Sequence, residues 1–117
     1  MSITLYGISN CDTVKKARTW LEAQQQSFAF HDFKKSGIDR ALIEGWLQRT
    51  EWQILVNRQS ATWHALSNER KDSIVDAVSA IGLMLELPSV IKRPVLTTAD
   101  AILVGFSDAL YQPFFQK

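Results

Sequence analysis

Cys11 is the one cysteine of the 117-residue chain, and it lies in the polar segment Ser9-Asn10-Cys11-Asp12-Thr13. This segment follows Ile3 to Tyr6, a short run typical of a strand, and precedes a helical pattern. The first turn of a helix has unpaired backbone N–H groups and a partial positive charge, and both favour a thiolate. The alternative is an inert core cysteine, which would bury its polar neighbours with it. The pattern therefore predicts that Cys11 is a nucleophile.

The residues one helical turn beyond Cys11 shape this prediction. Val14 occupies the fourth position of what would be a Cys-x-x-Cys motif, so Cys11 has no second thiol beside it. A disulfide at Cys11 must then be cleared by an outside thiol, either a small one such as glutathione or a second protein. Lys15 adds positive charge one turn away, whereas Asp12 acts in the opposite direction.

Two arginines are candidates for binding an anion near Cys11. Arg93 precedes Pro94 at the start of an expected strand, and Arg58 lies in a polar loop, Asn57 to Ser60. Together they would hold a carboxylate or an oxyanion by bidentate hydrogen bonds, although each alone is typical of a solvated surface charge. Their spacing does not show whether they meet.

Other polar residues offer less chemistry. His31 and Asp32 are adjacent on an expected strand, so their side chains point to opposite faces and do not form a catalytic pair. His31 and His64 stand apart, whereas a zinc site needs three or four converging ligands, and we expect no metal site.

The composition limits the class of protein. A formal net charge of +1 gives no electrostatic basis for binding nucleic acid or an anionic membrane. The N-terminus lacks the basic start and apolar run of a signal peptide, and the most apolar stretches, 81–87 and 101–106, are too short to span a bilayer. A single cysteine suits a reducing compartment, so we expect a cytoplasmic protein.

The first third of the chain predicts a β-α-β unit. After the strand that ends at Gly7, the spacing of Val14, Ala17 and Leu21 predicts an amphipathic helix over 12–25. The aromatic run 28–33 predicts a second strand. Because the two strands are joined through a helix, they should be parallel.

The middle of the chain predicts helices and no strand. Asp39 is placed to cap one helix and Thr62 a short second one, while a long helix is expected over 69–87 and should stop at Pro88. Two brief strands, 95–97 and 101–104, then form a hairpin, and Ser107 caps a last helix that Pro113 should break or distort.

This order is the thioredoxin topology, an α/β fold with an all-helical insertion between the β-α-β and β-β-α halves. We expect one domain over 1–117, in which 1–35 and 88–117 form the α/β core and 36–87 the helical insert.

Five segments in the same order resemble the arsenate reductase (ArsC) family. They are Leu5 to Ala17, His31-Asp32-Phe33-Lys34-Lys35, Leu55-Val56-Asn57-Arg58, Lys92-Arg93-Pro94-Val95 and Leu103-Val104-Gly105-Phe106. The chain is most similar to the YffB-like branch, which is related to the Spx regulators. The resemblance implies a thioredoxin-like fold, a nucleophilic Cys11 and a cis Pro94 bond.

Two departures from the family patterns matter for activity. Glutathione-coupled arsenate reductases have three arginines around the cysteine; Arg58 and Arg93 match two, but Gly105-Phe106-Ser107-Asp108 has no arginine for the third. Spx regulators sense oxidation through a Cys-x-x-Cys pair and bind RNA polymerase, and Val14 removes that pair.

The favoured function is that of a glutathione-dependent thiol reductase, proposed for YffB-like proteins. Cys11 would be the catalytic residue, with Asn10, Lys15, Arg58, Arg93 and Pro94 binding glutathione or substrate. Glutathione would be the thiol co-substrate of a monomeric protein, with glutaredoxin or a substrate protein thiol as further partners. The alternatives are arsenate reduction coupled to glutathione and glutaredoxin, and a non-enzymatic regulator of the Spx kind that binds a protein partner.

Overall fold

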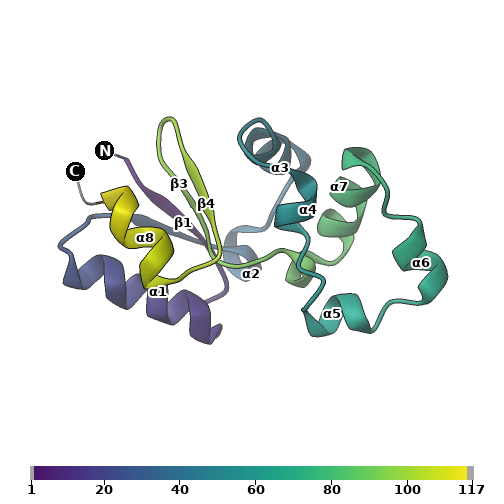
Figure 1. Ribbon diagram of the computed structural model, residues 1–117, viewed down its shortest axis with the longest axis horizontal. Coiled ribbons are helices and arrows are strands. Elements are labelled where there is room, and N and C mark those ends of the chain that lie inside the picture. The colour runs from purple at the N-terminus through teal and green to yellow at the C-terminus, as the bar shows by residue number, and fades with distance from the viewer. Residues whose placement is uncertain (1, 116–117) are drawn as a thin grey trace. The chain divides into compact units, whose positions relative to one another are not determined.

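The computed structural model describes residues 2–115, and the chain divides into two compact units. The α/β unit contains the residues up to Gly37 and those from Arg93 onward, whereas the helical unit contains Ile38–Lys92. Figure 1 shows that the strands of the described chain belong to the α/β unit.

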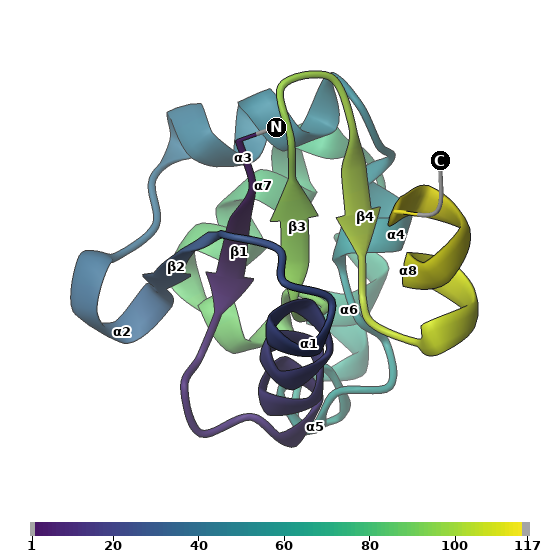
Figure 2. The ribbon, with the colours of Figure 1, turned by 90° about the vertical axis from the view of Figure 1, so that its left-hand side faces the viewer.

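Four strands form the sheet of the α/β unit in the order β2-β1-β3-β4 (Figure 2). They are β1 (Thr4–Gly7), β2 (Ala29–Asp32), β3 (Val95–Thr97) and β4 (Ile102–Val104). β1 is parallel to β2 and antiparallel to β3, which is antiparallel to β4. The helix α1 (Asp12–Ala23) joins the two parallel strands. The predicted thioredoxin-like order of elements is therefore confirmed.

One face of the sheet packs against α1 and the last helix, α8 (Asp108–Phe115), and Figure 2 shows α1 in front of the strands. Alternate residues of a strand point to the same face, which places Ile3 and Leu5 on this side. The fully or almost fully buried cluster consists of Ile3, Leu5, Ala17, Leu21, Leu96 and Tyr111. Each large aliphatic side chain in it contributes about 2 kcal/mol by leaving water. This core holds the strand and helix on either side of Cys11.

The ends of the first elements differ slightly from the expected ones. α1 stops at Ala23 rather than at Gln25, because Gln25 has a φ of 58° and cannot continue a right-handed helix. The chain after β2 forms a single helical turn, α2 (Phe33–Ser36), where the sequence predicted the end of a strand. Asp32 caps this turn by accepting a hydrogen bond from the Lys34 amide at 2.8 Å.

The helical unit contains five helices and one 3₁₀ turn in its described chain. They are α3 (Arg40–Leu47), α4 (Trp52–Leu55), α5 (Ala61–His64), α6 (Asn68–Asp72), α7 (Ala77–Glu86) and η1 (Pro88–Val90). Asp39 caps α3, as predicted, by accepting from the Leu42 amide at 2.8 Å. Ile43, Trp46, Leu55, Leu83 and Met84 are among its buried side chains.

Two predictions for this unit were wrong. The expected long helix over 69–87 is interrupted between α6 and α7, because Asp76 and Ser79 form a reciprocal capping box that starts a new helix. The helical spacing of apolar residues continues through this interruption, so the spacing alone predicted a single helix. The cap of α5 is Ser60, whose hydroxyl accepts from the Trp63 amide, rather than Thr62, whose hydroxyl instead pairs with Ser89.

Pro113 was expected to break or distort the last helix, and the helix is not broken there. Ser107 caps α8 as predicted, with the Leu110 amide donating to its hydroxyl at 3.0 Å, and the helix runs on to Phe115. Pro113 is the sixth of eight helical residues. Because proline has no N–H, one backbone carbonyl in the preceding turn loses its helical hydrogen bond, and this carbonyl lies on an exposed part of the helix.

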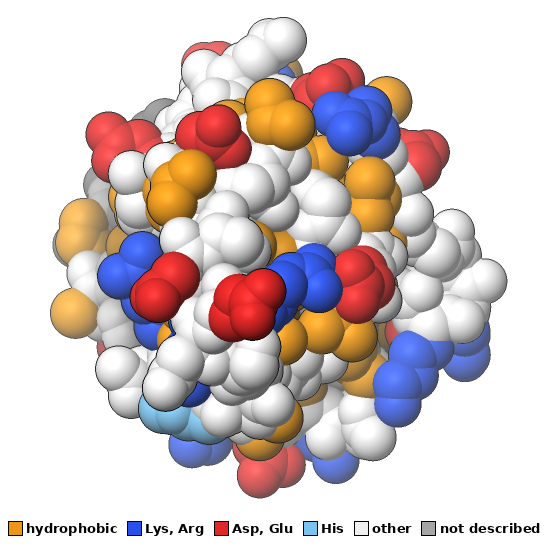
Figure 3. All heavy atoms as spheres, turned by 90° about the vertical axis from the view of Figure 1, so that its right-hand side faces the viewer, with side chains coloured by type: hydrophobic (Ala, Val, Ile, Leu, Met, Phe, Trp, Pro, Cys, Tyr) orange, Lys and Arg blue, Asp and Glu red, His pale blue; other side chains and the backbone are white. Residues whose placement is uncertain are grey.

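The surface over α6 and α7 has acidic and basic side chains interspersed with scattered apolar ones (Figure 3). Arg70 and Glu86 form a two-contact ion pair between these helices, with the shorter contact at 2.9 Å. In residues 2–115, no helix has the length and apolar character needed to cross a membrane.

Candidate active site around Cys11

Cys11 lies where the loop after β1 becomes helix α1. Its backbone is extended, with φ −89° and ψ 127°, and its N–H donates to the carbonyl of Ile8 at 3.1 Å. Its carbonyl accepts the first hydrogen bond of α1, from Lys15 at 2.9 Å. Cys11 is thus the N-cap residue, and its partly exposed side chain caps no backbone N–H of the helix.

The first turn of α1 gives Cys11 its electrostatic setting. The amides of Asp12, Thr13 and Val14 precede the first residue that can donate within the helix. They and the positive end of the helix favour a negative charge at a neighbouring atom. A partly exposed thiol in this position is therefore suited to nucleophilic attack as a thiolate.

Close packing of β1 on α1 fixes the position of this turn. Gly7 ends β1, and a Cβ atom built on it would lie 2.7 Å from Cγ2 of Val14. Val14 is itself fully buried. The absence of a side chain at Gly7 therefore lets the helix approach the strand.

Asp32 is a functional candidate that the sequence suggested only as a partner of His31, a role set aside because adjacent strand residues point to opposite faces. It lies opposite Gly7 in the parallel pairing of β1 and β2 and is 6% exposed. The Lys34 amide lowers the pKa of its carboxyl most strongly; burial opposes this, and hydrogen bonding from Ser9 and the charge of Lys35 also lower the pKa. The carboxylate thus connects the end of β2 to the loop that leads to Cys11. An Asp directly before a short polar helical turn was the available signal.

The start of β3 lies beside the end of β1, at the end of the sheet from which the Cys11 loop leaves. Tyr6 pairs with Val95, so the residues after β1 and those before β3 are neighbours. The Arg93–Pro94 peptide bond is cis, as the resemblance implied, and the Pro94 carbonyl accepts from the Gly105 amide at 2.8 Å. Pro94 is buried and Arg93 is partly buried.

The predicted site residues therefore fall into two groups. The first group belongs to the α/β unit and lies on the segments that follow β1 and precede β3, at one end of these strands; it consists of Asn10, Cys11, Lys15, Arg93 and Pro94. Arg58 belongs to the helical unit, where its exposed guanidinium lies 5.6 Å from the centre of the Trp63 ring.

The loop of Arg58 has a defined local structure. The Asn57 side chain accepts from the Gln59 amide at 3.0 Å, and the Asn57 amide donates to the Val90 carbonyl at 2.8 Å. These bonds hold the turn on either side of Arg58 as an Asx turn.

Known proteins match this chain along nearly its whole length. The sequence profile of the ArsC family matches residues 6–114. The chain belongs to the ArsC family. A solved structure of a protein named YffB superposes with a TM-score of 0.88 at 44% identity, covering 95% of this chain and 96% of the other.

Two sequence relatives show the breadth of the family around this member. An uncharacterised protein of Haemophilus influenzae is 38% identical over 113 residues, which is 97% of this chain and 98% of that protein. The global transcriptional regulator Spx of Streptococcus pneumoniae is 24% identical over 117 residues, covering 98% of this chain and 86% of the regulator. The relation to YffB-like proteins and, at greater distance, to Spx regulators is thereby confirmed.

Proposed function

We propose that this ArsC-family protein is a glutathione-dependent thiol–disulfide reductase with Cys11 as its single nucleophile. The observation that supports this most directly is the position of Cys11 as the N-cap of α1, with a fully buried valine three residues later. A cysteine in that setting is suited to attack a disulfide but has no adjacent thiol to resolve the adduct.

The reaction has two disulfide exchanges. The Cys11 thiolate attacks the glutathione sulfur of a mixed disulfide R–S–S–G, so that a Cys11–glutathione disulfide forms and R–S⁻ leaves and takes up a proton. A second glutathione, as its thiolate, attacks the glutathione sulfur of the adduct and releases the Cys11 thiolate. The net reaction converts R–S–S–G and one glutathione into R–SH and oxidised glutathione.

The remaining predicted residues would bind rather than react. Arg93 and Arg58 are proposed to hold carboxylates of glutathione or of the substrate, because a guanidinium pairs with a carboxylate through two hydrogen bonds. Lys15 and Asn10 would contact the same ligand beside Cys11. Pro94 would shape the wall of the site next to the thiol.

The setting in the cell is part of the proposal. A reducing cytoplasm would keep Cys11 as a thiol and supply glutathione in excess. A glutaredoxin or a protein mixed disulfide would be the macromolecular partner, and the protein would act as a monomer.

The test uses oxidised glutathione and intact-mass measurement. We expect one glutathione adduct on the protein, none on Cys11→Ser, and a rate about tenfold or more above that of an unstructured peptide thiol. No adduct, or a rate equal to that of the peptide, would overturn the proposal. Alanine variants of Arg93 and Arg58, made separately, should each slow the second step, which is followed as oxidised glutathione formed from a glutathionylated peptide.

The same preparation separates the two alternatives. Turnover of arsenate that needs glutathione and glutaredoxin and is lost in Cys11→Ser would show arsenate reduction. A regulator of the Spx kind would have ordinary thiol reactivity and a protein partner whose binding survives Cys11→Ser.

A further inference from the structure

A groove lies beside the Cys11 helix within the α/β unit. It has a volume of about 700 Å³ and lies between the outer side of α1 and the start of α8. Its lining residues are Lys15, Lys16, Thr19, Trp20, Ala23, Phe106, Ser107 and Asp108. Cys11 is not among them, and the lining residue nearest to it in sequence is Lys15, one helical turn further along α1. The volume is in the range of small-ligand sites.

The floor of the groove is aromatic and well supported. The rings of Trp20 and Phe106 both pack edge-to-face on the buried Tyr111, with ring centres 5.5 Å and 4.7 Å away. Edge-to-face contacts of this kind stabilise ring orientation. The two rings therefore give the groove an apolar surface that is packed against the buried core.

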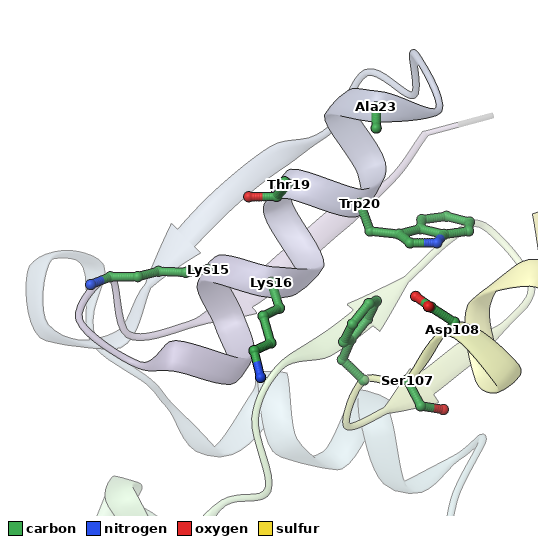
Figure 4. Close-up of a pocket in the computed structure, with 8 residues that line it drawn as sticks. Lys15, Lys16, Thr19, Trp20, Ala23, Ser107 and Asp108 are labelled. Carbon is green, nitrogen blue, oxygen red and sulfur yellow. The ribbon is translucent and has the colours of Figure 1, made fainter.

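Opposite charges border this surface. Figure 4 shows the Lys16 side chain extending toward the first turn of α1, while the Asp108 carboxylate points from α8 toward Trp20. Lys15 extends to the other side, away from Trp20. Among the described residues, no ion pair involves the Lys16 ammonium or the Asp108 carboxylate. The two groups are thus available to a ligand with a carboxylate, an ammonium and a short apolar stem.

We propose that this groove binds the zwitterionic amino-acid end of glutathione, the γ-glutamyl group, while the glutathione sulfur is at Cys11. Lys16 would pair with the α-carboxylate, Asp108 with the α-ammonium, and Trp20 and Phe106 would cover the methylene chain. This inference rests on the proposed function. It assigns a binding subsite to the γ-glutamyl group, which lies away from the sulfur that reacts with Cys11.

The lengths agree with this placement. Lys16 follows Cys11 by five residues, which is about 7.5 Å along a helix axis. The chain from the glutathione sulfur to the α-carbon of its glutamyl group spans about seven bonds, roughly 9 Å when extended. The Lys16 side chain extends toward the first turn of α1, as side chains of a helix tilt toward its N-terminus, and this shortens the remaining distance along the axis.

The experiment uses S-methylglutathione, which has no reactive thiol and so tests the groove apart from the chemistry at Cys11. Binding is followed through the indole N–H signals of ¹⁵N-labelled protein, with the signal of Trp20 assigned from Trp20→Phe. We expect a saturable shift of the Trp20 signal at millimolar probe. S-methylcysteinylglycine, which lacks the γ-glutamyl group, should shift it little at the same concentration.

Charge variants then test the contacts. Lys16→Glu and Asp108→Asn should each weaken binding of S-methylglutathione about threefold to fivefold, the range of an exposed ion pair. Lys71→Glu is the matched control, because Lys71 belongs to α6 of the helical unit and does not line the groove, and it should leave binding unchanged.

The outcomes separate the two proposals. An unshifted Trp20 signal, equal binding of the two probes, or insensitivity to both groove variants would overturn the groove assignment. If oxidised glutathione still forms the Cys11 adduct in that case, the proposed function stands without this subsite. Binding in the groove without any adduct at Cys11 would instead overturn the proposed function.

Discussion

Replacing Gly7 by alanine tests whether close packing between β1 and α1 determines where Cys11 lies. The added Cβ would be 2.7 Å from Cγ2 and 3.3 Å from Cγ1 of Val14, whereas carbon atoms in favourable contact are about 3.5–4.0 Å apart. Val14 is fully buried and cannot swing into solvent. To relieve the overlap, the first turn of α1 must move by about 0.8 Å or more.

The expected magnitude follows from two opposing effects. Overpacking of a buried site costs about 1–3 kcal/mol, while replacing a glycine inside a strand recovers about 0.5–1 kcal/mol of backbone entropy. Gly7→Ala should therefore lower the free energy of unfolding by about 0.5–2 kcal/mol. The alkylation rate of Cys11 should also fall, because the cysteine lies at the end of the displaced turn.

Val14→Ala provides the second half of a double-mutant cycle. Alone it removes two buried methyl groups, at about 0.8 kcal/mol each plus the cost of the cavity. Combined with Gly7→Ala, it removes the clashing atoms, and the new Cβ fills part of the space. The double variant should be more stable than the sum of the single effects predicts, by about 1 kcal/mol or more.

The assay is urea unfolding followed by tryptophan fluorescence, with alkylation of Cys11 as the second readout. Gly45→Ala is the control, because no atom lies within 4 Å of the Cβ that it would add, and alanine in α3 should stabilise by about 0.5–1 kcal/mol. Additive effects of Gly7→Ala and Val14→Ala, within about 0.5 kcal/mol, would refute the steric reasoning.

Three further substitutions test the core, the capping carboxylate and the missing second thiol. The buried Tyr111 hydroxyl has no hydrogen-bond partner in residues 2–115, and burial raises its pKa. Tyr111→Phe should therefore raise the free energy of unfolding, measured in urea, by about 1 kcal/mol. A lower free energy of unfolding would contradict this. Because the pKa of Asp32 is lowered from 3.8 in the folded protein, its ionised form stabilises the fold above that value and the effect is lost as pH falls through the lowered pKa. Asp32→Asn should accordingly be less stable than the parent at pH 7, with the difference shrinking below about pH 4, and a pH-independent difference would argue against a charged cap. Val14→Cys places a second thiol one turn from Cys11, so a glutathione adduct at Cys11 should resolve to an intramolecular disulfide, seen as a loss of two hydrogens by mass relative to the reduced protein. An adduct as stable as that of the parent would contradict the inference that Val14 is what leaves the adduct to an outside thiol.

Local sequence patterns predicted most of the α/β unit correctly. The first strand was evident because branched and bulky side chains alternate before Gly7, and α1 because Val14, Ala17 and Leu21 repeat at helical spacing. The parallel pairing of β1 and β2 followed from the intervening helix. Such patterns depend on a few neighbouring residues and need no knowledge of distant contacts.

The helical unit was predicted less well, since several of its boundaries depend on competing hydrogen bonds. Asp76 and Ser79 end one helix and begin another although the apolar spacing continues. Ser60 and Thr62 are both able to cap α5, and the contact of Thr62 with Ser89, 27 residues away, decides between them. Distant contacts of this kind are not visible in local spacing.

For the candidate site, residue type and spacing were enough to select Cys11 as the proposed nucleophile and to show that the sequence places no second thiol beside it. Cys11 is the one cysteine of the sequence, and it lies between a strand and the helix that it caps. Val14 occupies the position that a second thiol would have in a Cys-x-x-Cys motif. These are properties of residue type and of spacing over a single turn, which the local backbone conformation preserves.

The surroundings of Cys11 could not be read from local spacing and depend on the tertiary structure. The contact of Gly7 with Val14, the link from Asp32 to the Cys11 loop and the groove between α1 and α8 join residues that are up to about a hundred positions apart. Their proximity comes from the order of strands in the sheet and from the shared core on one face, which brings Trp20 and Tyr111 together. Long-range packing of this kind is set by the whole chain at once, because the burial of each apolar face depends on all the others.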